Sequence, residues 1–155
     1  MVEVSSLLEY SQEVRRRYFD ALAKLPWSEL VRNREASWHS IRNIFIHTLQ
    51  AIDFWIRFLQ KEQPRKDREF DDYSTIDDIR SYTEYVDERV GRYLRSLTPA
   101  ELTLEYSLPD DSSFKVTVED VLIHVFEEEL HHRGELIALL WQMNVEPPAM
   151  GWKNL

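Results

Sequence analysis

Hydrophobic residues recur at intervals of three and four along four long stretches of the chain, separated by polar segments. This spacing places apolar side chains on one face of an α-helix and is typical of helices that pack around a core. We therefore expect four helices, at about 5–24, 41–61, 76–97 and 118–144. A residue that cannot continue a helix follows each of them, at Pro26, Pro64, Pro99 and Pro147.

Short polar side chains stand just before three of these helices. Ser40 is the predicted N-cap of the second helix. Thr75–Asp78 and Thr117–Asp120 have the Thr-x-x-Asp form of a capping box, so the third and fourth helices are expected to begin there. Residues 26–37 are predicted to be a connection and residues 61–72 a polar loop.

The hydrophobic period changes to two between the third and fourth helices. Apolar residues alternate with polar ones on both sides of a turn at 109–113, at Leu102, Leu104, Tyr106, Leu108, Phe114, Val116 and Val118. This alternation predicts a short β-hairpin or an extended crossover. The expected fold class is therefore all-α, an antiparallel four-helix bundle with a short β-hairpin-like crossover before the last helix.

The second helix carries apolar residues on two sides. One stripe runs from Ile41 to Leu59, and the other contains His47, Ala51 and Phe54. A helix that is apolar on two sides lies between neighbours, so we expect His47 to be buried or nearly so.

Composition narrows the class of protein further. A length of 155 residues favours one domain over 1–155, and the net charge of −9 argues against a nucleic-acid partner. The consecutive residues Arg15, Arg16 and Arg17 are expected on a solvated face, and Trp152 is the expected anchor of the C-terminal tail. Cysteine is absent, and we see no signal peptide and no apolar run long enough to span a membrane, so we expect a cytoplasmic protein.

The last predicted helix holds the residues that suggest chemistry. His124, Glu128, His131, His132 and Glu135 follow one another at spacings that keep them near one side of a helix. Glu128 and His132, at i and i+4, can present an oxygen and a nitrogen to one cation. His47 is the only histidine elsewhere on an apolar stripe, so His47, Glu128 and His132 form a predicted set of metal ligands.

Other interpretations of these residues remain open. His124 with Glu128 is a second chelating pair, and the histidines can form a polar network with Glu128 and Glu135 that holds no metal. A ferritin-like site is rejected because the second helix has no glutamate. The His-Glu-x-x-His motif of metalloproteases is absent, and His39 is expected to be a surface or capping residue.

Two segments of the sequence resemble the DinB/YfiT-like family of metal-dependent four-helix-bundle enzymes. The first is Trp38-His-Ser-Ile-Arg-x-Ile-x-x-His47, and the second is His124-Val-x-x-Glu-Glu-x-His-His-Arg-Gly-Glu-Leu136. The resemblance covers nearly the whole chain. It implies an up-down-down-up bundle, often dimeric, that binds a divalent ion such as zinc, nickel, manganese or iron.

The same resemblance implies a reaction class. Relatives resemble transferases, isomerases or hydrolases that act on small molecules with a low-molecular-weight thiol as co-substrate. By position, the metal ligands implied are His47, Glu128 and His132, although the family usually has histidine where this chain has Glu128. A carboxylate favours harder metals such as iron or manganese, or else the site has decayed. If the helix rotates slightly, His131 can replace one of these ligands. Glu129 or His131 is a candidate for proton transfer.

Two hypotheses follow from the sequence. The first is a metal-dependent enzyme of the DinB-like class that acts on a small-molecule substrate as a homodimer, without nucleic acid or membrane as a partner. The second is a metal-free helical bundle that functions through self-association or partner binding.

Overall fold

The structure is a computed structural model that describes residues 3–63, 66 and 68–151. These residues are mostly helical, with one two-stranded antiparallel sheet. The elements are α1 Val4–Leu22, α2 Trp27–Val31, α3 Ile41–Leu59, η1 Phe70–Asp72, α4 Ile76–Ser96, η2 Pro99–Thr103, β1 Glu105–Ser107, β2 Lys115–Thr117 and α5 Val118–Gln142. The predictions of a mostly helical fold and of a hairpin before the last helix are confirmed. Trp152, the expected tail anchor, and residues 64, 65 and 67 of the predicted loop lie outside the described residues.

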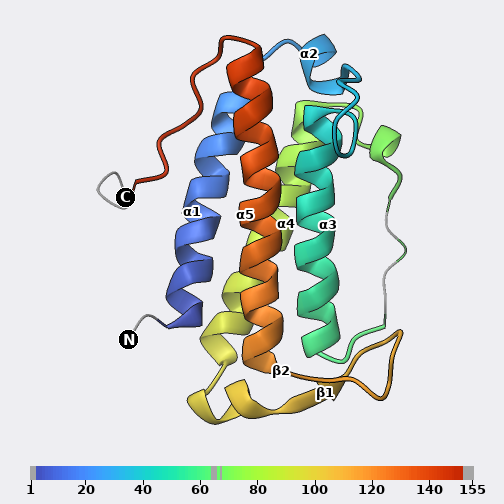
Figure 1. Cartoon of the computed structure of the whole chain (residues 1–155), viewed down its shortest axis with the longest axis vertical. Coiled ribbons are helices and arrows are strands. Elements are labelled where there is room, and N and C mark those ends of the chain that lie inside the picture. Colours follow the sequence, from blue (N-terminus) through green and yellow to red (C-terminus); the bar gives the residue numbers. More distant parts are fainter. Residues whose placement is uncertain (1–2, 64–65, 67, 152–155) are drawn as a thin grey trace.

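The four long helices lie side by side in Figure 1, with α5 between α1 and α3 in this view. Helix α3 contacts both α4 and α5, and α1 contacts the same two helices from the other side. The β-hairpin and η2 lie at one end of the helices, and α2 lies at the other. The helices enclose an apolar core in which Ile44, Leu49, Ile56, Leu122 and Leu140 are fully buried. Burying side chains of this size stabilises the fold by about 1.5–3 kcal/mol each.

The predicted helix starts are confirmed in detail. Ser40 Oγ accepts a hydrogen bond from the Asn43 amide at 3.1 Å and caps α3. The side chains of Thr75 and Asp78, and those of Thr117 and Asp120, form reciprocal capping boxes at α4 and α5. Because Thr117 is both the last residue of β2 and the N-cap of α5, its capping box fixes where the hairpin ends and α5 begins.

Helix α5 is positioned by the hairpin that precedes it. In the antiparallel pair, Glu105 lies opposite Thr117 and Ser107 opposite Lys115. The Val118 amide donates to the Leu104 carbonyl at 3.1 Å, so the first residue of α5 continues the pairing. No helix in the described parts of the chain is both long enough and apolar enough to cross a membrane.

Three expectations about side chains and connections are corrected. The connection at 26–37 contains the short helix α2, whose Leu30 is buried. Arg15 is not on a solvated face, because its side chain is only 4% exposed and binds two carboxylates. The second stripe of α3 is only partly covered: Phe54 is exposed, and His47 is half-buried.

Polar residues of α3 that lie outside both predicted stripes are buried instead. Asp53 is 3% exposed and pairs with Arg57 of the same helix and with Arg89 of α4. Gln50 donates to the Arg68 carbonyl at 2.9 Å. These partners compensate the cost of burying polar groups, so the packing of α3 does not follow apolar periodicity alone.

Candidate metal centre

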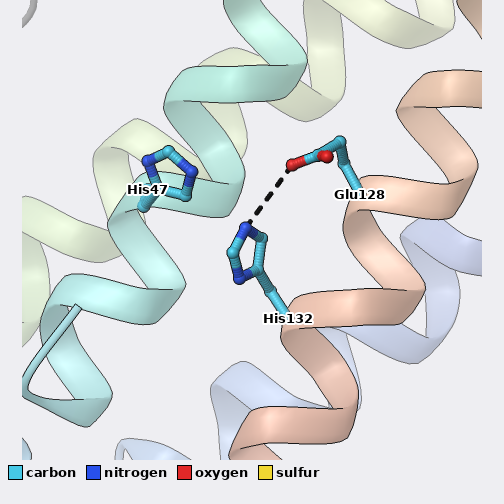
Figure 2. Close-up of side chains that lie close together, drawn as sticks. All are labelled: His47, Glu128 and His132. Atoms are coloured by element: carbon cyan, nitrogen blue, oxygen red, sulfur yellow. Dashed lines mark ion pairs between the residues drawn. The ribbon is translucent and has the colours of Figure 1, made fainter. Parts of the chain in front are cut away.

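His47, Glu128 and His132 come together between α3 and α5. Figure 2 shows His47 on α3 facing the other two side chains across the gap between the helices. One donor atom from each residue lies within 4.8 Å of the others. The rings of His47 and His132 are edge to face, with their centroids 4.8 Å apart. We call these three residues the candidate metal centre.

The local geometry of α5 explains two of the three positions. Glu128 and His132 are one turn apart on the same face, and Glu128 Oε2 lies 3.5 Å from His132 Nε2. His132 is almost fully buried, with 6% of its side chain exposed. His131 is turned by about 100° and is 65% exposed, so it points away from His47.

Glu135 holds His132 from the other side of the ring. Its Oε2 lies 2.8 Å from His132 Nδ1 and accepts a second hydrogen bond, also 2.8 Å, from Ser37 Oγ. Burial raises the pKa of Glu135, but the hydrogen bonds from His132 and Ser37 outweigh it and lower the pKa below its ordinary value. An ionised Glu135 favours the proton on Nδ1 and leaves the Nε2 lone pair facing Glu128.

A lone pair facing a carboxylate oxygen is an unfavourable contact unless something positive lies between them. Protonation of His132 supplies that charge, and so does a cation bound by both atoms. Glu128 and Glu135 pair only with histidines, because no lysine or arginine in the described residues forms an ion pair with either of them. Two carboxylates without a fixed cation as partner match the charge of a divalent cation.

The surroundings of His47 favour the neutral form of its imidazole ring. Burial and the neighbouring His132 lower the pKa of His47 below its ordinary value of 6.5. A neutral imidazole keeps a lone pair available near pH 7, as metal binding requires. The indole of Trp38 stacks on the His47 ring, with centroids 4.0 Å apart, and shields it from solvent on one side.

The segment before α3 brings Ser37 and Trp38 to the centre. Glu35, Ser37 and His39 have backbone φ angles of 53°, 49° and 70°, in the left-handed region that residues other than glycine seldom adopt. Such conformations cost about 1–3 kcal/mol each and cluster at functional sites. Ser37 was not predicted, and Trp38 was named only as the start of the family-like motif, because no local periodicity links this segment to α5. His39 is exposed, as expected.

The remaining candidates on α5 lie at the edge of the centre or away from it. His124 is 42% exposed, and its Nε2 lies 3.9 Å from Glu128 Oε1. A second possible ligand group combines His131, His132 and Glu135. That group is exposed at His131, and two of its members, His132 and Glu135, are already hydrogen-bonded to each other.

Glu129 does not belong to the centre, which corrects the expectation that it can assist proton transfer there. Its Oε2 lies 2.7 Å from Arg15 Nη1, and its Oε1 lies 3.2 Å from Arg133 Nη2. Glu129 therefore faces α1, whereas Glu128 faces α3.

Comparison with known proteins agrees with the resemblance of the motifs. The model of the DinB family matches residues 1–154. The uncharacterized protein YizA of Bacillus subtilis (strain 168) is 24% identical over 139 residues, which cover 90% of this chain and 87% of that protein. Because the family match spans almost the whole sequence, this chain belongs to the DinB family.

Proposed function

We propose that this chain is a metal-dependent enzyme whose divalent ion is held by His47, Glu128 and His132. The observation that carries the proposal is the convergence of two imidazoles and one carboxylate within 4.8 Å from two different helices. The donor set fits a divalent ion because the nitrogens and the oxygen come with uncompensated negative charge. A bound ion supplies a Lewis acid that activates a water or thiol, or polarises a carbonyl.

The chain's own residues have distinct tasks in this proposal. Glu135 fixes the orientation and tautomer of His132, and Ser37 holds Glu135 in place. Trp38 covers His47 and limits the access of water. A carboxylate at position 128, where relatives usually have histidine, favours iron or manganese over zinc.

The reaction class we propose is that of the thiol-dependent transferases, isomerases or hydrolases which this family resembles. The substrate is a small molecule, and the co-substrate is a low-molecular-weight thiol. The number of donors supports this class, because three protein ligands leave coordination positions free for a thiolate and a substrate atom.

We also infer that the four long helices form an antiparallel bundle of up-down-down-up topology. In Figure 1, α1 and α5 run towards the α2 end, whereas α3 and α4 run towards the hairpin end. The contacts of α1 and of α3 with both α4 and α5 support a ring of four helices around one core.

Metal content is the test of the proposed function. The untagged protein, purified without chelator and incubated with iron(II), manganese, nickel or zinc, is expected to retain about one ion per chain by elemental mass spectrometry. His132→Ala and Glu128→Gln should lose the ion, while His131→Ala, its exposed neighbour, should keep it. Retention in His132→Ala, or no metal in the wild type with any of the four ions, would contradict the proposal.

A second function is favoured by one surface of α5. Ile123, Leu130 and Trp141 are 41%, 41% and 58% exposed, and their spacing places them within about 20° of one another around the helix. We propose that the chain binds a second copy of itself through this stripe. Such self-association fits both a homodimeric enzyme and a metal-free module. Leu130→Glu should halve the mass measured by light scattering, and an unchanged mass would remove this proposal.

A further inference from the structure

A cavity of about 280 Å³ lies where the hairpin meets α3 and α5. Its walls come from three separate segments of the chain: α3, the hairpin and the first turns of α5. The lining residues are Trp55, Leu108, Val116, Asp120, Val121 and His124. Small-molecule sites in proteins begin at about this volume and are mostly apolar.

The cavity adjoins the candidate metal centre through one shared residue. His124 lines the cavity, and its Nε2 lies 3.9 Å from Glu128 Oε1. The His124 ring also meets Trp55 edge to face, with the centroids 5.2 Å apart. On α3, Trp55 follows His47 by eight residues, which is about 12 Å along a helix. A molecule of moderate length therefore reaches both the cavity and the centre.

The lining selects against negative charge. Neither lysine nor arginine is among the lining residues, and Asp120 supplies a carboxylate. Hydrogen bonds from Thr117 lower the pKa of that carboxyl, so Asp120 stays ionised near pH 7. Burial of an anion beside a fixed carboxylate and apolar walls is costly, whereas an uncharged ring loses little by leaving water.

We propose that this cavity is the subsite for an uncharged, apolar group of the substrate, such as an aromatic ring. The role rests on the proposed function, because the substrate reaches the metal centre from this subsite past His124. Trp55 supplies a flat aromatic wall, and Val116 and Val121 set the width. Specificity for the apolar group therefore comes from residues that do not bind the ion.

Two fluorescent probes with the same aromatic skeleton test this subsite. N-phenyl-1-naphthylamine is uncharged, and 1-anilinonaphthalene-8-sulfonate differs from it by one sulfonate. The uncharged probe should bind saturably at one site per chain, at least tenfold more tightly than the sulfonate. Tighter binding of the sulfonate, or no saturable binding of the uncharged probe, overturns the subsite.

Matched variants locate the probe. Val116→Trp fills the cavity and should weaken binding of the uncharged probe at least tenfold, and Leu108→Trp provides a second filling variant should the first fail to fold. Leu104→Trp adds the same side chain at a position that is 49% exposed and does not line the cavity, so its affinity should match that of the wild type. Unchanged affinity in a folded filling variant overturns the proposal.

A separate measurement tests whether the bound probe lies close to the candidate metal centre. The relaxation rate of the probe's protons should be much higher when the protein is loaded with paramagnetic manganese(II) than when it is loaded with zinc. No enhancement with manganese bound overturns the link between subsite and centre. If the protein binds the probe but retains no metal, the proposed function is wrong and the apolar site stands. If the protein retains metal but does not bind the probe, only the subsite is wrong.

Discussion

Helix α5 carries two polar clusters that begin at neighbouring residues and differ in how their charges are balanced. Glu128 and His132 face α3 in the candidate metal centre, while Glu129 and Arg133 face α1. We call the second cluster the buried ion network; its members are Arg15, Asp87, Glu129 and Arg133. The two clusters share helix α5 but face different neighbours, α3 for the first and α1 and α4 for the second, so they can be compared for the effect of charge balance.

The buried ion network is internally compensated. Each oxygen of Glu129 is paired with an arginine, and each oxygen of Asp87 is paired with Arg15 or Arg16. In and beside the candidate metal centre, the ion-pair partners of Glu128 and Glu135 among the described residues are histidines alone. A cluster with fixed cations connects helices, whereas one without them retains affinity for an added cation.

The largest expected effect is on stability, from neutralising Glu129. Glu129→Gln leaves Arg133 buried without a counter-ion and Arg15 with Asp87 alone, and should lower the free energy of unfolding by about 3–5 kcal/mol. Glu128→Gln, the matched change one residue earlier, should cost less than about 1 kcal/mol because Glu128 is 31% exposed. Urea denaturation followed by circular dichroism, on metal-free protein, measures both. Equal losses for the two variants would remove the distinction between the clusters.

The next effect is on metal affinity, from releasing His132. Glu135→Gln keeps the size of the side chain but removes the charge that orients the His132 ring. Metal affinity should fall about 10–100-fold, as is typical when the partner of a ligating histidine is lost. Competition with a chelator of known affinity measures the change. An affinity equal to that of the wild type would show that Glu135 has no orienting role.

A smaller effect is expected at the edge of the buried ion network. Arg16 pairs with Asp87 Oδ2 at 3.1 Å, but its side chain is 55% exposed. Water and salt screen such a pair, so Arg16→Ala should cost at most about 1 kcal/mol. If Arg16→Ala lowers the free energy of unfolding as much as Glu129→Gln in the same urea series, exposure does not determine which arginines stabilise the fold.

The smallest effect is on the pH dependence of stability in the metal-free protein. Burial and His132 lower the pKa of His47 in the folded state below its unfolded value of 6.5. Above that value His47 is neutral in both states; as the pH falls below it, the unfolded state binds the proton more readily, and stability is lost. His47→Asn should therefore lose less stability between pH 7 and 5 than the wild type. Parallel losses in the two proteins would contradict this assignment.

Local sequence signals predicted the framework of the fold. Ser40, Thr75 and Thr117 predicted three helix starts because a cap is decided by residues three positions away. The alternation around residue 106 predicted the hairpin for the same local reason. Helix α2 was missed because its five residues are too few to establish a period.

Partners from distant segments were the part that the sequence did not predict. Arg15 was assigned to solvent because an arginine run in an acidic chain has no local sign of its counter-ions, which lie 72 and 114 residues further along, at Asp87 and Glu129. Ser37 was missed for a similar reason, since its hydrogen bond to Glu135 spans 98 residues. His47, Glu128 and His132 were selected correctly as neighbours, because two of them share one face of a helix and His47 was the one histidine on an apolar stripe. Their binding of a metal remains a prediction.

The most direct test of the candidate metal centre is a crystal structure of the protein grown with manganese, with diffraction recorded where manganese scatters anomalously. The account predicts one strong anomalous peak per chain, about 2.0–2.3 Å from a nitrogen of His47, an oxygen of Glu128 and Nε2 of His132. A peak between His131 and Glu135 instead, or no peak near α5 in crystals of a protein that has bound manganese, would contradict it.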